Sequence, residues 1–164
     1  MICYFLRHGI AVAPGEWQGS DAERPLTPDG CKRMEREAKA IASLGLDIDL
    51  IVTSPLLRAR QTAEFVADRL GLCDAIVDDE RIAHRFNADA CRAILADHPR
   101  ANSVMLVGHE PAMSSTIGRL IGSADIELKK AALAGIELPD RNSTVGTLIC
   151  LIPPKALVTL GRLS

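Results

Sequence analysis

The chain has 164 residues, of which 48% are hydrophobic and 3% aromatic, and its formal net charge is −2. The hydrophobic share excludes an intrinsically disordered chain, and the length fits one domain with a core of its own. The few aromatic residues and the nearly balanced charge argue against a nucleic-acid-binding protein, so we expect no nucleic-acid partner.

The five cysteines show neither a CxxC pair nor zinc-finger spacing, so we expect buried free thiols and a reducing compartment. They are Cys3, Cys31, Cys73, Cys91 and Cys150. The first residues lack a basic segment followed by a long apolar one, and no apolar run approaches about 18 residues. We therefore expect a cytoplasmic protein without a signal peptide, membrane span or membrane partner. A monomer is a separate expectation that none of these features tests.

The first part of the chain alternates short apolar runs with segments of helical periodicity. Thr27-Pro28 and Ser54-Pro55 each read as a helix N-cap followed by a proline, and Gly45 and Gly71 as helix ends. The expected elements are a strand at 2–6, a loop at 10–26, a helix from Thr27 to Gly45, a strand at 50–53 and a helix from Ser54 to Gly71.

The second part continues this alternation and then changes. We expect a strand at 75–77, a loop at 78–87, a helix at about 88–98 that Pro99 stops, a strand at 103–107 and a helix opened by Pro111. Two strands follow at 133–138 and 147–152, joined by the polar turn 139–146. A connection this short predicts an antiparallel pair.

Strand–helix alternation predicts an α/β three-layer sandwich with helices on both faces. Its central sheet would be mostly parallel, with an antiparallel C-terminal hairpin. Ligands of such sheets bind at the carboxyl ends of the strands. His8, Ser54 and His109 each follow a predicted strand, so we expect them to lie close together.

The residues at the first of these strand ends suit phosphoryl transfer. Arg7 offers a permanent charge and a planar fork of N–H donors that matches phosphate oxygens. His8 can act as the nucleophile of a covalent mechanism, and Gly9 lets the backbone come close to a ligand. We predict that Arg7 and His8 are catalytic and that Gly9 binds substrate.

The other two strand ends add a second arginine and a second histidine. Arg58 lies in the first turn of a predicted helix, where unsatisfied N–H groups already favour an anion. His109 would donate a hydrogen bond to a phosphoryl oxygen or protonate the leaving group. Arg7, Arg58 and His109 would thus form a phosphate pocket that needs no metal.

Four motifs in this order resemble the histidine phosphatase superfamily, which is named for its Arg-His-Gly motif, and most of all its small SixA-type phosphohistidine phosphatases. The matching segments are Leu6-Arg7-His8-Gly9, Arg24-Pro25-Leu26-Thr27-Pro28-Asp29-Gly30, Ser54-Pro55-Leu56-Leu57-Arg58-Ala59 with Gln61-Thr62, and Val107-Gly108-His109-Glu110-Pro111. The resemblance covers nearly the whole chain.

The resemblance implies a phosphoglycerate-mutase-like fold and a single domain over 1–164 without a large cap insertion. It implies that His8 is the nucleophile that becomes phosphorylated and that no cofactor is needed. It further implies that the substrate is phosphohistidine on a phosphotransfer domain or on a phosphotransferase-system protein. The predicted function is therefore a phosphohistidine phosphatase.

One departure concerns the general acid. Larger members of the superfamily carry a catalytic carboxylate on inserted segments, for which this chain has little room. Glu80 is our candidate because it follows the third predicted strand, while Glu16, Asp21 and Glu110 are candidates by residue type alone. A labile P–N bond would reduce the need for such an acid.

Two other functions stay open. A small-molecule phosphomonoesterase could use the same pocket, with Trp17 and Arg24 in a substrate-recognition loop over 10–24. In that case Arg24 binds substrate. A non-catalytic phosphate-binding module is the third reading, and the four intact residues Arg7, His8, Arg58 and His109 argue against it.

Overall fold

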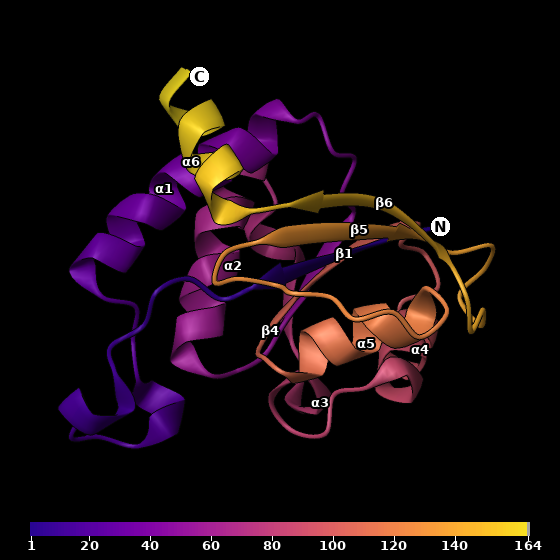
Figure 1. Cartoon of the computed structure of the whole chain (residues 1–164), viewed down its shortest axis with the longest axis horizontal. Helices are drawn as coiled ribbons and strands as arrows, with labels where there is room; N and C mark the ends of the chain where they lie inside the picture. Colours follow the sequence, from indigo (N-terminus) through magenta and orange to yellow (C-terminus); the bar gives the residue numbers. More distant parts are fainter. Residues whose placement is uncertain (164) are drawn as a thin grey trace.

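The computed structural model describes residues 1–163 and contains one six-stranded sheet with the strand order β3-β2-β4-β1-β5-β6 (Figure 1). The strands are β1 (Ile2–Arg7), β2 (Leu50–Thr53), β3 (Ile76–Asp78), β4 (Ser103–Gly108), β5 (Leu133–Glu137) and β6 (Thr147–Ile152). Strands β1 to β4 pair in parallel, whereas β5 is antiparallel to both β1 and β6. The predicted mixed sheet with an antiparallel C-terminal hairpin is confirmed.

Helices cover both faces of this sheet, as Figure 1 shows. On one side lie α1 (Pro28–Ser43), α2 (Leu57–Leu70) and α6 (Pro154–Leu163), and on the other α3 (Glu80–Ala83), α4 (Ala88–Asp97) and α5 (Ala112–Leu120). Three 3-10 turns complete the structure: η1 (Pro14–Glu16), η2 (Asp21–Glu23) and η3 (Cys73–Ala75). The predicted three-layer arrangement is therefore confirmed.

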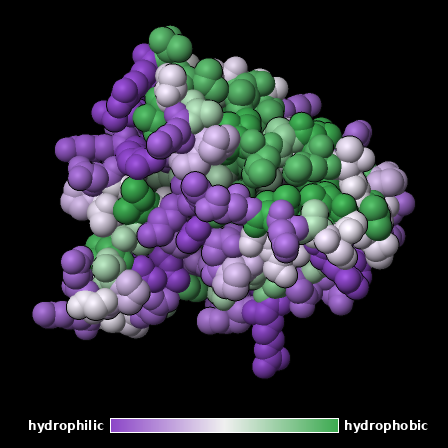
Figure 2. Space-filling view, viewed as in Figure 1, coloured by the Kyte–Doolittle hydropathy of each residue, from purple (hydrophilic) through white to green (hydrophobic). Residues whose placement is uncertain are grey.

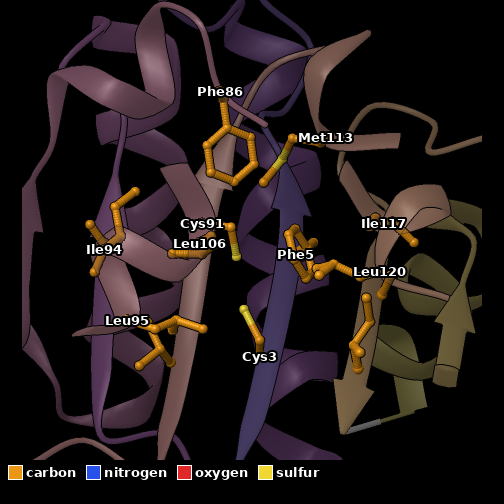
Figure 3. Close-up of a cluster of buried hydrophobic side chains, with 14 of the residues drawn as sticks. Cys3, Phe5, Phe86, Cys91, Ile94, Leu95, Leu106, Met113, Ile117 and Leu120 are labelled. Carbon is orange, nitrogen blue, oxygen red and sulfur yellow. The ribbon is translucent and has the colours of Figure 1, made fainter. Parts of the chain in front are cut away.

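The central strand β1 supplies side chains to both cores. Successive side chains of a strand point to opposite faces, so Cys3 and Phe5 pack with α4 and α5 while Tyr4 and Leu6 pack with α1 and α2. Figure 3 shows Phe5 and Cys3 in the first of these clusters, near Cys91 of α4. Burial on both faces fixes β1, and with it the position of the residues that follow its end.

Two predicted helix signals are confirmed and one is wrong. Thr27 caps α1, its Oγ1 accepting from the Gly30 N–H at 2.9 Å, and Gly71 ends α2 with a φ of 69°. Helix α2, however, begins at Leu57 rather than at Ser54-Pro55. Ser54 Oγ accepts from the Leu56 N–H at 3.2 Å and also bonds a histidine of β4's exit, so this hydroxyl serves the strand end instead of a helix cap.

Two further elements differ from expectation. The segment expected as a loop at 78–87 contains α3, whose N-cap Asp79 accepts from the Arg81 N–H at 2.9 Å. Helix α6 was not predicted, and its Gly161 lies so close to α1 that a Cβ there would sit 2.0 Å from the Arg36 carbonyl oxygen. Four residues are too few to show helical periodicity, and α6 depends on packing against α1.

The cysteines are free, as expected, but only Cys3 and Cys91 are buried. Cys31 and Cys150 are partly buried, and the expectation of burial is wrong for Cys73, which opens the surface turn η3 and is exposed. Over residues 1–163, the structure contains no helix that is long and apolar enough to cross a membrane.

Candidate active site

Three strand exits meet at the carboxyl edge of the sheet. Backbone hydrogen bonds extend the pairing beyond the strands, with the His8 N–H donating to the Gly108 carbonyl at 3.0 Å and the Ser54 N–H to the Val107 carbonyl at 2.9 Å. The ring centroids of His8 and His109 are 5.1 Å apart. Parallel strands that end at one edge thus bring together residues that are far apart in the sequence.

His8 is held as a neutral imidazole. Its Nδ1 lies 2.7 Å from the carbonyl oxygen of Gly9. Because a carbonyl oxygen can only accept a hydrogen bond, Nδ1 carries the proton. The Nε2 lone pair is then available for attack. Burial, and next the neighbouring His109, lower the pKa of His8 to about 3, so the ring is uncharged at neutral pH.

Gly9 is tied in turn to α2. Its N–H donates to Thr62 Oγ1 at 3.0 Å, and the Thr62 hydroxyl donates to the Arg58 carbonyl at 2.7 Å. Thr62 is completely buried, and a Cβ on Gly9 would lie 2.8 Å from Met34 Cγ. This chain of bonds fixes the peptide that orients His8 relative to the helix that carries Arg58.

The two arginines of the site have different partners. Arg7 Nη1 donates to the Leu128 carbonyl at 3.0 Å. Arg58 lies in the first turn of α2 and is 6% exposed; its Nη1 donates to the Asp21 carbonyl at 2.9 Å and its Nη2 to Asp21 Oδ2 at 3.0 Å. Both guanidinium groups are therefore oriented by protein oxygens on one side.

Three nitrogens of the site are buried and have no hydrogen-bond partner within residues 1–163. They are Arg7 Nε, Arg58 Nε and His109 Nδ1. Buried polar groups almost always have partners, and one left unpaired costs about 1–3 kcal/mol. Two arginine N–H donors and a histidine nitrogen that lack partners beside a nucleophile fit an anionic ligand such as a phosphoryl group.

His109 is also neutral. Burial, and next the positive charge of Arg58, lower its pKa to about 4, while the Asp21 carboxylate opposes this shift. Its Nε2 lies 2.8 Å from Ser54 Oγ. When the Ser54 hydroxyl donates this bond, the proton of His109 sits on Nδ1, one of the three nitrogens without a partner.

The remaining predicted residues lie around this centre. Arg24 donates from Nε to Asp21 Oδ1 at 2.8 Å and from Nη1 to the Val12 carbonyl at 2.7 Å. Glu80 is exposed at the start of α3. The substrate-binding role of Arg24 and the general-acid role of Glu80 stay predictions.

The other candidate acids are engaged or exposed. Hydrogen bonds from Arg24 and the charge of Arg58 lower the pKa of Asp21, which is therefore ionised at neutral pH. Glu110 accepts from the backbone and the hydroxyl of Ser114, and Glu16 is exposed in η1. An ionised Asp21 is unsuited to donate a proton.

Two residues that contribute to this geometry, Thr62 and Leu128, were not predicted from the sequence to have a role in the site. Thr62 stands one helical turn after Arg58, in the Gln61-Thr62 segment, so its hydroxyl could have been expected to bond the Arg58 carbonyl. Leu128 acts through a backbone carbonyl, which every residue has, and so leaves no signal in the sequence.

Comparisons with known proteins agree on one family. Residues 3–86 match the model of the histidine phosphatase superfamily (branch 1). An uncharacterized protein of Picosynechococcus sp. is 37% identical over 142 residues, which are 83% of this chain and 84% of that protein. The phosphohistidine phosphatase SixA of Escherichia coli is 38% identical over 72 residues, which are 44% of this chain and 43% of SixA.

The fold agrees with this match. The structure of the protein histidine phosphatase SixA complexed with tungstate superposes with a TM-score of 0.84 at 27% sequence identity, covering 96% of this chain and 99% of that chain.

Proposed function

This chain belongs to the histidine phosphatase superfamily and is thereby a phosphatase, and we propose that it hydrolyses phosphohistidine on a signalling or phosphotransfer protein. One observation carries the proposal. The neutral His8 keeps its Nε2 free because Nδ1 bonds Gly9, and it lies beside buried donors of Arg7, Arg58 and His109 that lack partners in the described structure.

The reaction has two steps with His8 as nucleophile. In the first, His8 Nε2 attacks phosphorus, the P–N bond to the substrate histidine breaks, and the departing imidazole nitrogen takes up a proton from solvent. In the second, water attacks the phosphohistidine formed on His8, its hydroxyl joins the phosphoryl group and its other proton returns to solvent, which releases inorganic phosphate and restores the neutral ring. When Ser54 donates to Nε2, His109 carries its proton on Nδ1 and can donate it in a hydrogen bond to a phosphoryl oxygen or to the departing nitrogen.

Arg7 and Arg58 supply the charge that this transfer needs. Phosphoryl transfer depends mainly on positioning and on stabilising the charge spread over the phosphoryl oxygens. Both arginines are fixed on one edge by Leu128 and Asp21, and each leaves its Nε for the ligand. The pocket is therefore oriented before substrate arrives, which favours the transition state.

The engagement of Asp21 and Glu110 by other residues supports phosphohistidine as the substrate. An alkoxide leaving group of a phosphate ester needs a proton donor, whereas imidazole leaves with less assistance. Asp21 is held ionised by two arginines, and Glu110 is bound by Ser114. Within residues 1–163, the connections that leave β1 to β4 carry no helix longer than the four-residue α3 before the next long helix begins, which supports a single domain over 1–164 without a cap.

The decisive experiment measures phosphate release from a phosphohistidine-bearing phosphotransfer domain and from an alkyl phosphate monoester, whose alkoxide leaving group needs a proton donor. We expect rapid release from the protein, slow release from the ester, and none from His8→Ala. His98→Ala is the matched control, since His98 ends α4 at the opposite edge of the sheet, and it should keep wild-type activity.

Two outcomes would contradict the proposal. Activity retained by His8→Ala would remove His8 as nucleophile. Fast ester hydrolysis with an untouched phosphohistidine protein would indicate a small-molecule phosphomonoesterase and make Glu80→Gln the next variant to measure.

A further inference from the structure

We propose that Asp21 is a positioning residue that turns the Arg58 guanidinium so that its Nε edge faces the phosphoryl group. The inference rests on the proposed function, because Arg58 is taken there as a ligand of the phosphoryl group. It gives the segment 10–26 a role in assembling the phosphate pocket.

The geometry of Arg58 is the first argument. A guanidinium group has five N–H donors in one plane. Asp21 accepts from both terminal nitrogens of Arg58, through its carbonyl oxygen at 2.9 Å and its Oδ2 at 3.0 Å. Because both acceptors belong to one residue, they restrain the plane and the rotation of the group, and they leave the Nε–H and one adjacent N–H for a second, bidentate partner.

Burial shows that this second edge is reserved. The Arg58 side chain is 7% exposed, and its Nε has neither a hydrogen-bond partner in the described structure nor access to solvent. Burial also lowers the pKa of Arg58, opposed by the Asp21 carboxylate, which keeps the guanidinium charged. An arginine held in this way needs an anion on its free edge.

Asp21 is itself fixed, although its side chain is 60% exposed. Arg24 donates to Asp21 Oδ1 at 2.8 Å and to the Val12 carbonyl at 2.7 Å, so it connects the beginning of the 10–26 segment to its later part. The segment is anchored on α2 as well, since the Leu26 N–H donates to Gln61 Oε1 at 2.8 Å. Arg24 would accordingly act on the pocket through Asp21.

Two other roles of Asp21 predict different results. If it were the proton donor of the reaction, the amide variant would be as inactive as alanine. If it competed with phosphate for Arg58, its removal would tighten anion binding. Asp21→Asn keeps the two oxygens that accept from Arg58 and removes the charge, but its amide nitrogen replaces the oxygen that accepts from Arg24, whereas Asp21→Ala keeps only the backbone acceptor.

The experiment measures tungstate binding by calorimetry, together with kcat and KM on the phosphohistidine protein. We expect Asp21→Ala to weaken tungstate binding about tenfold, the size of one charge-assisted hydrogen bond, and to lower kcat/KM similarly. Asp21→Asn should lose less tungstate affinity than Asp21→Ala, because it keeps both acceptors of Arg58 and loses only the bond from Arg24. Glu23→Ala changes an exposed acid of the same turn, whose carboxylate bonds Ser20, and should change nothing.

A second background tests whether Asp21 acts through Arg58. Arg58→Lys keeps a charge but removes the planar fork, so Asp21→Ala should cause no further loss of tungstate affinity there. Circular dichroism checks that each variant folds.

Three results would overturn the inference: unchanged or tighter tungstate binding in Asp21→Ala, an Asn variant as impaired as the Ala variant, or an undiminished effect of Asp21→Ala in the Arg58→Lys background. The substrate is tested separately. Asp21-dependent tungstate binding without phosphohistidine cleavage would support the role of Asp21 and reject the proposed substrate.

Discussion

The two arginines of the site are held by two different parts of the molecule. Arg7 donates to the carbonyl of Leu128, which is 1% exposed, whereas Arg58 donates to Asp21, whose side chain is 60% exposed on the 10–26 segment. A buried carbonyl is fixed once the core is packed. An exposed carboxylate such as that of Asp21 has to compete with water and salt ions for its arginine.

His8, like Arg7, is held by buried groups; we call these two residues and their partners the buried half of the site. The His8 ring is oriented by Gly9, and the Gly9 peptide is fixed by Thr62, which is completely buried. His8, the proposed nucleophile, and Arg7 are thus positioned by buried groups, while Arg58 also depends on an exposed carboxylate of a surface segment. The difference shows that the proposed phosphate pocket combines a part whose hydrogen bonds are shielded from salt with a part whose hydrogen bonds salt can weaken.

The largest expected effect comes from removing either arginine. Arg7→Ala and Arg58→Ala should each lower kcat/KM by about 10²–10³-fold, the size found when one charge-stabilising donor is removed. Inhibition by inorganic phosphate should weaken in both variants, because we propose that each arginine contacts the phosphoryl group. Unchanged inhibition by phosphate in one variant would show that this arginine does not bind the phosphoryl group.

A smaller effect should follow from Thr62→Val, which nearly keeps the volume of the side chain but removes its hydroxyl. We expect about 1–3 kcal/mol less stability towards urea and about tenfold lower kcat, because the buried Gly9 N–H loses its acceptor and the peptide that orients His8 is freed. Thr62→Ser should restore most of the activity.

Thr116→Val is the matched control for Thr62→Val. Thr116 is also a buried threonine within a helix, but its Oγ1 has no hydrogen-bond partner within residues 1–163. Its replacement should leave kcat unchanged and cost little stability. Equal losses in the Thr62 and Thr116 variants would show that the Thr62 hydroxyl has no special role.

The last expected effect is on stability in acid. His8 has a folded-state pKa of about 3 against an ordinary value of 6.5, so between these pH values the unfolded chain binds the proton and the folded chain does not. Stability should therefore fall as pH falls from 6.5, by at most about 1.4 kcal/mol per pH unit from this residue. Urea titrations of wild type and His8→Ala from pH 7 to 4 measure it.

His8→Ala should show a shallower decline of stability in this range. Parallel curves for the two proteins would mean that the His8 ring is not held neutral by burial, and would place it outside the buried half of the site.

The sequence carried much of the fold and the chemistry of the centre. Apolar runs marked all six strands, and Thr27 and Gly71 marked helix ends, because caps and strand periodicity are local properties of the chain. The prediction that Ser54 caps a helix was wrong because it also relied on local sequence. Its cap-like context is local, whereas its bond to His109 spans 55 residues.

The sequence by itself determined which groups could handle a phosphoryl group, since the charge of an arginine and the lone pair of a histidine belong to the residue. It also predicted that His8, Ser54 and His109 would meet, because parallel strands end at one edge. Only the tertiary structure decided that Thr62 fixes Gly9 across 53 residues and that Asp21 holds Arg58 across 37. Such pairings depend on where packing places each segment, and no spacing along the chain encodes them.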